Sequence, residues 1–327
     1  MKLKSVMLLT LITLFITATG ITVAETPDAS QGIYTGVFLD QTQTMASFEK
    51  MVGKKMALQM WFTNFTNDAT TNIPVTLIKA NKKLGKISMV TWEPWTDLNS
   101  ILQGKLDAYL QRNARLIAEL KIPVMIRFAH EMNGNWYSWD GHHNGGLETK
   151  GFGDPNLADG PERYVAAFRH VVDLFRKEGA TNVLWVWAVN ESSVPNEAWN
   201  DMLSYYPGDQ YVDWIGIDGY NWGTTRSFSK WTDFQSIFRP SYDKLTQAIP
   251  NKPVIIAEFA STETGGNKAA WITDAFTQMK KFPRLHAFVW FSVYKETAWS
   301  VDSSDEALEA FTKAMKDKTY LDRFSGF

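Results

Sequence analysis

The feature of this sequence that most constrains its fold is a regular alternation of continuous apolar runs with amphipathic runs. Eight apolar runs are rich in β-branched and aromatic residues, which is typical of strands covered on both faces. The predicted strands are residues 34–39, 56–62, 86–92, 123–129, 183–187, 212–220, 253–259 and 286–291.

The amphipathic runs between these strands predict helices. In residues 162–179, apolar side chains recur at offsets that place them on one helical face, from Tyr164 to Phe175. Gly179 follows as the expected C-terminal cap. The other helices are expected near residues 43–52, 73–84, 105–120, 196–204, 236–249, 268–281 and 305–318.

Eight strands alternating with eight helices predict an α/β fold, a single (β/α)8 TIM barrel. A doubly wound sheet is the alternative, but no Gly-rich phosphate loop follows an early strand. The hydrophobic content of 45% excludes a disordered chain. The net charge of −2 gives no field that would gather a nucleic acid, so we expect no nucleic-acid partner. The absence of Cys excludes disulfide scaffolds and thiol nucleophiles.

The first 24 residues have the pattern of a signal peptide. Lys2 and Lys4 precede an apolar run, and Ala24 ends a short run of small residues suited to cleavage. A membrane anchor is the alternative, but threonines and Gly20 interrupt the apolar run. We therefore expect a secreted monomer, periplasmic or extracellular, with no stable membrane association after cleavage and a catalytic domain over residues 25–327.

Two predicted strands end in a glutamate. The fourth strand terminates in His130-Glu131, and the apolar run of the seventh strand leads directly into Glu258. An ionised carboxylate in such a place is costly to desolvate unless a site uses it. Strands four and seven lie nearly opposite each other in an eight-stranded barrel, so the two carboxylates can flank one glycosidic bond. A structural ion pair at the barrel rim is the alternative for each glutamate alone.

Other strand ends supply residues that are expected to support this pair. Asp218 and Tyr220 lie two residues apart near the end of the sixth strand, so both are expected to point into the mouth and orient Glu258. Trp290, near the end of the eighth strand, is expected to form a stacking floor for a sugar ring, with a role in capping the core as the alternative.

The third strand ends in a carboxylate with tryptophans on both sides. Glu93 lies between Trp92 and Trp95, and we interpret all three residues as substrate-contacting rather than catalytic. Indole faces stack well on the apolar faces of sugar rings.

Two polar pairs are poorer candidates. Asn190-Glu191 has the dipeptide that serves as acid/base in many barrel glycosidases, but it follows strand five rather than strand four. His142-His143 lies in a Gly-, Asn- and Asp-rich loop, where solvated polarity is a better interpretation than metal binding. The sequence therefore implies no metal and no cofactor.

Residues 127–139, RFAHEMNGNWYSW, resemble the signature of glycoside hydrolase family 26, in which His-Glu stands where related barrel families have Asn-Glu. The resemblance continues through residues 215–220, 257–259 and 289–291 and so runs across essentially the whole mature chain. Members are retaining endo-β-glycanases, chiefly β-mannanases, with mixed-linkage β-glucanases and β-1,3-xylanases as smaller groups.

The resemblance implies a role for each matching residue. Glu131 is similar to the family's acid/base and is expected to have a raised pKa, whereas Glu258 is similar to its nucleophile and is expected to be ionised. The residues that resemble the family's subsite and supporting residues are Arg127, His130, Trp136, Tyr220 and Trp290.

Two features of this chain depart from the family's common pattern. Mannanases of the family commonly carry a His at the end of strand three, where this chain has Trp92-Glu93-Pro94-Trp95, and this favours a glucan over a mannan. A polar, Gly-rich loop over residues 140–160 could wall off one end of the cleft, which leaves endo and exo action open.

The sequence as a whole predicts a secreted retaining endo-β-glycanase that hydrolyses β-1,4 bonds by double displacement, with mixed-linkage β-1,3-1,4-glucan as the favoured polysaccharide. A β-1,4-mannanase, a β-1,3-xylanase and an exopolysaccharide-trimming hydrolase are alternatives on the same machinery. A non-catalytic carbohydrate-binding barrel is the alternative from another class.

Overall fold

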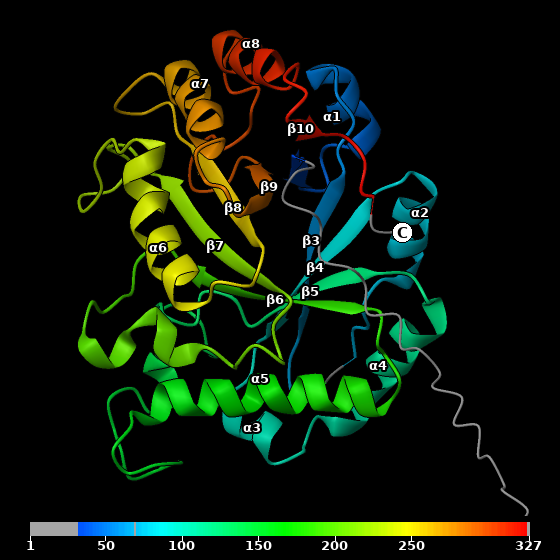
Figure 1. Ribbon diagram of the computed structural model, residues 1–327, viewed down its shortest axis with the longest axis vertical. Coiled ribbons are helices and arrows are strands. Elements are labelled where there is room, and N and C mark those ends of the chain that lie inside the picture. Colours follow the sequence, from blue (N-terminus) through cyan, green and yellow to red (C-terminus); the bar gives the residue numbers. More distant parts are fainter. Residues whose placement is uncertain (1–31, 69, 326–327) are drawn as a thin grey trace, which may run out of the picture.

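The computed structural model describes residues 32–68 and 70–325, which form a closed parallel barrel with helices outside it (Figure 1). Neighbouring strands pair in chain order from β2 to β9, and β9 pairs with both β8 and β2, which closes the barrel. The prediction of a single (β/α)8 barrel is confirmed. The barrel strands are β2 Gly36–Leu39, β3 Leu58–Phe65, β4 Ile87–Pro94, β5 Val124–Phe128, β6 Val183–Asn190, β7 Trp214–Asn221, β8 Val254–Ser261 and β9 Leu285–Ser292.

The helices lie between consecutive strands, as the amphipathic runs predict. The α-helices are α1 Met45–Val52, α2 Val75–Lys83, α3 Leu98–Leu102, α4 Asp107–Leu120, α5 Asp159–Lys177, α6 Phe234–Ala248, α7 Lys268–Met279 and α8 Asp305–Ala314. Two short 3₁₀ turns, Ala198–Asn200 and Met202–Tyr205, replace the helix expected over residues 196–204. The short helix α3 was not predicted. Gly179 follows α5 with φ of +81°, as expected of a residue that ends a helix.

Two short strands extend the sheet at the amino end of the barrel. β1 (Ile33–Tyr34) pairs in parallel with β10 (Tyr320–Leu321), and β1 also pairs with β9. Thr35 divides the predicted first strand in two, because its hydroxyl and its amide both donate to the carbonyl of Leu321. Strand runs of two residues carry too little periodicity for the sequence to predict them.

Side chains of the barrel strands form two apolar layers, one inside the barrel and one between the strands and the helices. Strands β4, β8 and β9 are buried along their whole length. Successive side chains on a strand point to opposite layers. Whether a rim residue reaches the barrel mouth therefore depends on its parity within the strand.

The predicted signal peptide, residues 1–24, lies outside the described residues. In the part of the chain that the structure describes, no helix is both long enough and apolar enough to cross a membrane.

Candidate active site

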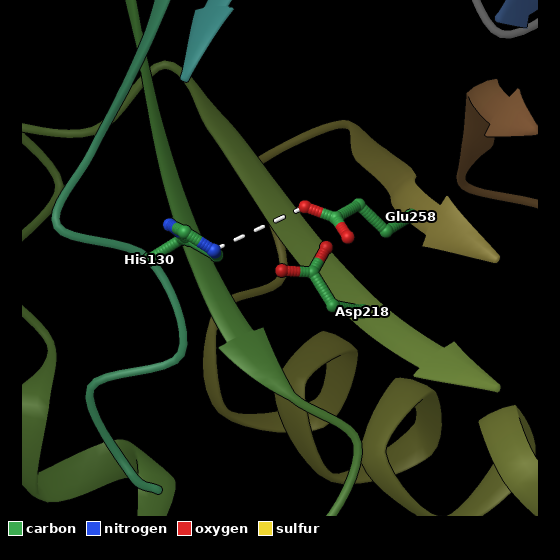
Figure 2. Close-up of side chains that lie close together, drawn as sticks. All are labelled: His130, Asp218 and Glu258. Carbon is green, nitrogen blue, oxygen red and sulfur yellow. Dashed lines mark ion pairs between the residues drawn. The ribbon is translucent and has the colours of Figure 1, made fainter. Parts of the chain in front are cut away.

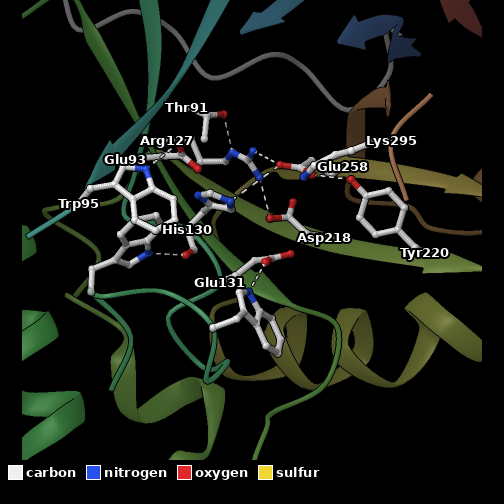
Figure 3. A network of polar contacts seen from close by, with 12 residues as sticks. Thr91, Glu93, Trp95, Arg127, His130, Glu131, Asp218, Tyr220, Glu258 and Lys295 are labelled. Atoms are coloured by element: carbon white, nitrogen blue, oxygen red, sulfur yellow. Dashed lines mark hydrogen bonds and ion pairs between the residues drawn. The ribbon is translucent and has the colours of Figure 1, made fainter. Parts of the chain in front are cut away.

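Polar side chains from β4, β5, β7 and β8 meet at the carboxyl end of the barrel (Figure 3). A register shift between β7 and β8 helps to bring them together. Ile217 pairs with Ile256, but Asp218 pairs with Glu258, so Ala257 is an extra residue in β8. Bulges of this kind re-aim side chains and are frequent beside active sites. Here the bulge places Glu258 directly beside Asp218.

Arg127 lies at the centre of the cluster and is fully buried. Its guanidinium donates to Asp218 at 2.6 Å, to an Oε atom of Glu258, and to the hydroxyl of Thr91 at 2.9 Å. Burial opposes the charge of Arg127, but Asp218 and Glu258 outweigh that effect and raise its pKa. Burial also raises the pKa of Asp218, an effect that Arg127 opposes. Arg127 therefore holds two carboxylates from neighbouring strands in fixed positions.

Glu258 receives a second hydrogen bond from Tyr220. The phenol of Tyr220 donates to the other oxygen of Glu258 at 2.5 Å, and burial together with the charge of Glu258 raises the pKa of that phenol. Both oxygens of Glu258 therefore accept from fixed donors. Tyr220 orients Glu258 directly, as predicted, whereas Asp218 does so through Arg127.

Glu131 lies on a strained turn that directly follows β5. Ala129 and Glu131 have φ of +48° and +53°, a region that costs a residue with a side chain about 1–3 kcal/mol. Three hydrogen bonds hold the turn: Ala129 N to Trp92 O, Glu131 N to Ala188 O, and Trp139 Nε1 to His130 O. The strain turns Glu131 from the line of the strand toward the mouth of the barrel.

Trp136 folds back over Glu131 and donates its Nε1 proton to Oε2 at 2.8 Å. Gly134 makes this possible, because a Cβ there would lie 2.6 Å from the indole of Trp136. The indole is 41% exposed, so it can contact a bound sugar while it holds the carboxyl group.

The environment of Glu131 differs from that of Glu258. Burial and the charge of Glu258 raise the pKa of Glu131 to about 8, and the hydrogen bond from Trp136 only partly opposes this. This shift favours the protonated form of Glu131 at neutral pH, as predicted. The two buried carboxyl groups on this rim thus have different hydrogen-bond partners and different charges around them.

His130 is buried and neutral, since burial and Arg127 lower its pKa. Its Nε2 lies 3.9 Å from Glu258, while its Nδ1 has no hydrogen-bond partner among the described residues.

His130, Asp218 and Glu258 offer ligand atoms that all lie within 4.8 Å of one another (Figure 2). The guanidinium of Arg127 bonds both carboxylates, however, and so supplies the positive charge that a metal ion would bring. We therefore interpret the cluster as two carboxylates positioned by Arg127 rather than as a metal centre.

The third predicted strand contributes Glu93 and Trp95 to the site, but not Trp92. The indole of Trp95 is 43% exposed and donates to Glu93 at 3.2 Å. Burial raises the pKa of Glu93, and the charge of Glu258 adds to this. The prediction that Trp92 contacts substrate is wrong. Trp92 pairs with Phe128 in the sheet and packs under the helices against Phe175, because its parity is opposite to that of Glu93.

The prediction that Trp290 forms a stacking floor is also wrong. Trp290 pairs with Phe259, which has the parity opposite to Glu258, and it packs outward against Phe311. Its indole donates to the carbonyl of Trp299 at 3.0 Å. Trp299, on the loop after β9, is the tryptophan that lies against Tyr220, with ring centroids 4.9 Å apart.

Sequence reasoning missed Tyr137 as a site residue. Its ring stacks on Trp139 at 4.2 Å and lies 5.0 Å from the ring of His130. Burial raises the pKa of Tyr137, and the charges of Glu131 and Glu258 add to this. Its position six residues after Glu131, in an aromatic run, is the signal that could have identified it.

Two other rim features lie beside this centre. Glu191, a poorer acid/base candidate, follows β6, and its pKa is raised by burial; its charge adds slightly to the raised pKa of Glu131.

The loop over residues 140–160 packs outside the barrel, where Asn144 accepts from the amide of Leu98 and Arg163 donates to the carbonyl of Asn144. These contacts anchor the loop to α3 and to the start of α5.

Comparisons with known proteins agree with this geometry. The chain is 42% identical over 272 residues to Endoglucanase H of Acetivibrio thermocellus, in an alignment that covers 82% of this chain and 28% of that protein. It is 30% identical over 177 residues to a mannan endo-1,4-β-mannosidase of Bacillus subtilis, covering 52% and 39% of the two chains. The chain thus spans well under half the length of these curated relatives.

Among solved structures, the fold is similar to that of a GH26 β-mannanase from Bacteroides ovatus. The TM-score is 0.66 at 20% identity, with 90% of this chain and 91% of that chain covered. The sequence model described as glycosyl hydrolase family 26 matches residues 20–282, which is most of the chain. With the paired carboxylates at the ends of β5 and β8, this match shows that the chain belongs to glycosyl hydrolase family 26.

Proposed function

We propose that this protein is a retaining glycoside hydrolase that cleaves a β-linked polysaccharide by double displacement. The observation that carries the proposal is the contrast between two buried carboxyl groups on one rim. Glu131 has a pKa raised to about 8, whereas Glu258 accepts hydrogen bonds from Arg127 and Tyr220. One group can donate a proton while the other attacks, as retention requires.

In the first step, Glu131 donates its proton to the glycosidic oxygen as the bond to the anomeric carbon breaks. An oxygen of Glu258 forms a bond to that carbon and gives a covalent glycosyl-enzyme. In the second step, Glu131, now a carboxylate, removes a proton from water. The water oxygen bonds to the anomeric carbon, and Glu258 leaves as a carboxylate.

The surrounding residues support these two roles. Arg127 and Tyr220 fix the position of Glu258, so that little reorganisation is needed when it attacks. Trp136 holds Glu131 and presents an exposed indole face to the sugar beside it. No cofactor takes part in this chemistry.

For the substrate, we propose a β-1,4-linked glycan attacked in an endo mode, with mixed-linkage β-1,3-1,4-glucan favoured. The similarity to a protein named Endoglucanase H covers 82% of this chain, and Glu93 beside Trp95 offers an acceptor next to a stacking face. An acceptor in that place reaches an equatorial hydroxyl in the plane of a stacked ring. β-1,4-Mannan is the second candidate, because relatives named mannan endo-1,4-β-mannosidase align over shorter parts of the chain.

We also propose that the protein is exported by its first 24 residues and acts as a secreted monomer. The charged start and apolar run of the sequence support export, and a polysaccharide substrate is consistent with it.

The test is reducing-sugar release from barley β-glucan, galactomannan, β-1,3-xylan and carboxymethylcellulose, with Glu258→Gln as the inactive control. We expect β-glucan to be cleaved fastest, and NMR of the first products should show the β-anomer. Mannan cleaved about tenfold faster would reject the glucan preference and leave the catalytic pair standing. Binding of these glycans without hydrolysis would indicate a carbohydrate-binding barrel, and a first product of α-configuration would reject retention. Product lengths at low conversion would separate endo from exo action.

A further inference from the structure

Lys268 is a buried cation that the chemistry proposed above does not use. It is the first residue of α7, its side chain is 1% exposed, and its Nζ has three acceptors. These are the carbonyl of Ala298 at 2.9 Å, the carbonyl of Ser300 at 2.6 Å and the hydroxyl of Ser303 at 2.8 Å. An ammonium group has three donors, so each has a partner. All three acceptors belong to the loop between β9 and α8.

The position of Lys268 is unfavourable for a lysine on two grounds. Burial removes the ammonium group from water, and the amino end of a helix carries partial positive charge. Burial lowers the pKa of Lys268 to about 7, an effect opposed by the carboxylates of Glu263 and Asp302. A buried cation at this cost suggests that its contacts serve more than packing.

The loop that Lys268 holds carries an aromatic residue of the site. Trp299 lies between the two carbonyls that accept from Lys268, so its backbone is fixed on both sides. Its ring contacts Tyr220, with centroids 4.9 Å apart, and Trp222, with centroids 4.8 Å apart. Trp290 also supports the loop, by donating to the carbonyl of Trp299.

The position of the Tyr220 ring in turn sets the position of its hydroxyl group, which donates to Glu258. Contacts therefore run without a gap from Nζ of Lys268, through the backbone and ring of Trp299, to Tyr220 and then to the carboxylate. A shift of the loop would move the face against which Tyr220 rests. Misplacement of a reacting group by about 1 Å can cost a factor of about 100 in rate.

We propose that Lys268 is a positioning residue for Glu258, which it acts on by fixing Trp299 against Tyr220. The proposal rests on the role of Glu258 as nucleophile. It assigns to the β9–α8 loop a part in glycosylation, beyond any contact that the loop makes with substrate.

Lys86 offers a control far from the site, because it is a second buried lysine whose ammonium group donates to a backbone carbonyl. Its side chain is 2% exposed and donates to Glu49 and to the carbonyl of Met56, at the opposite end of the barrel. Lys268→Met and Lys86→Met should both lower the melting temperature. Only Lys268→Met should affect the site.

The experiment compares both variants with the wild type at about pH 6, where Lys268 and Glu131 are protonated, and well below the melting temperatures. The first readout is hydrogen exchange of residues 293–304, whose amides include Trp299 N, bonded to Val293 O. We expect faster exchange there in Lys268→Met and unchanged exchange in Lys86→Met. Unchanged exchange in Lys268→Met would overturn the proposal whether or not the protein cleaves glycosides.

The second readout is glycosylation by an activated aryl β-glycoside, which depends on Glu258 but needs no proton from Glu131. We expect Lys268→Met to lower the single-turnover rate constant of glycosylation, measured from the release of the aryl alcohol, by about 10- to 100-fold. The dissociation constant of the glycoside should change less than about threefold, and Lys86→Met should change neither quantity. In a Tyr220→Phe background, Lys268→Met should cost much less, because both changes act on one path. Additive effects, or a loss confined to the dissociation constant of the glycoside, would overturn the proposal. A wild type inactive on every glycoside would instead reject the proposed function, and hydrogen exchange would still decide whether Lys268 holds the loop.

Discussion

The two ends of the barrel hold buried charge in different ways. At the amino end, Lys86 pairs with Glu49, which also accepts from the amide of Met56, so one cation faces one anion. At the carboxyl end, the described residues include one fully buried guanidinium, that of Arg127, among several buried carboxyl groups. These carboxyl groups are Glu93, Glu131, Asp218 and Glu258, each at most 9% exposed.

The difference shows which end is shaped by chemistry rather than by stability. A balanced buried pair satisfies both partners, whereas surplus buried carboxylates repel one another and must bind protons or lose stability. Burial raises the pKa of Glu131 to about 8, and the charge of Glu258 on the same rim adds to this effect. Strongly shifted groups that gather at one place are candidates for a functional site.

The largest difference in activity between the two ends is expected when one carboxylate is removed at each end. Glu258→Gln should lower kcat/KM by at least about 10⁴-fold on both polysaccharide and aryl glycoside, because no other group can form the glycosyl-enzyme. Glu49→Gln should leave kcat/KM within about twofold and lower the melting temperature, because it leaves Lys86 without its anionic partner. Initial rates and thermal melts of both variants test this. Residual turnover in Glu258→Gln above about 1% would place the nucleophile elsewhere.

A smaller effect separates the two carboxylates of the active end from each other. Glu131→Ala should lower polysaccharide hydrolysis by about 10²- to 10⁴-fold but retain fast glycosylation by an aryl glycoside with a good leaving group. Added azide should restore turnover, since it attacks the glycosyl-enzyme without a general base. Burst kinetics and detection of the β-glycosyl azide measure both effects. Equal losses on both substrates, with no rescue by azide, would contradict the acid/base role.

The raised pKa of Glu131 predicts that both activity and stability fall as the pH rises. The proton donor is lost as the pH rises, so kcat/KM on polysaccharide should fall about tenfold per pH unit above about pH 8. The ordinary pKa of a glutamate is 4.5. Between pH 4.5 and about pH 8, the folded protein keeps the proton of Glu131, whereas the unfolded chain has lost it. Its contribution to stability is therefore complete below pH 4.5 and is lost as the pH rises through 8.

The matched variant is Glu131→Gln, which keeps the shape of the side chain and removes the titration. Its melting temperature at about pH 8 should exceed that of the wild type by about 2–5 °C, whereas Glu49→Gln should be less stable than the wild type at the same pH. A melting temperature of Glu131→Gln at or below the wild-type value would show that the charge surplus is not costly.

The sequence predicted the architecture and the two glutamates because each depends on a strong local signal. Apolar runs that are covered on both faces alternate with amphipathic helices, and Glu131 and Glu258 each end such a run. The two-residue strands β1 and β10 were missed, since a run that short carries no period. The helix expected over residues 196–204 is two 3₁₀ turns, because Asp201 ends the first turn and its side chain caps the second.

The errors at the rim have a single physical cause. Trp92 and Trp290 lie near strand ends, but strand parity points both into the layer under the helices. The bulge at Ala257, which restores Glu258 to the inner face, cannot be read from the chain, because it depends on pairing with β7. The sequence thus predicted which strand ends carry site residues. The pairing between strands decides which side chains at those ends reach the mouth of the barrel.

The smallest expected effects distinguish Trp92, which points from β4 into the layer under the helices, from Trp95, which follows β4 and lies at the mouth of the barrel. Trp92 is fully buried among Phe65, Tyr109 and Phe175, so Trp92→Ala should cost about 3–5 kcal/mol of stability. Trp95 is 43% exposed at the mouth, so Trp95→Ala should cost little stability and raise KM for β-glucan by about three- to tenfold. Urea unfolding and steady-state kinetics on the folded variants measure the two quantities. If the folded Trp92→Ala variant had a KM raised as much as that of Trp95→Ala, Trp92 would be shown to contact the substrate. An unchanged KM in Trp95→Ala would contradict the proposal that Trp95 stacks on a sugar ring beside Glu93.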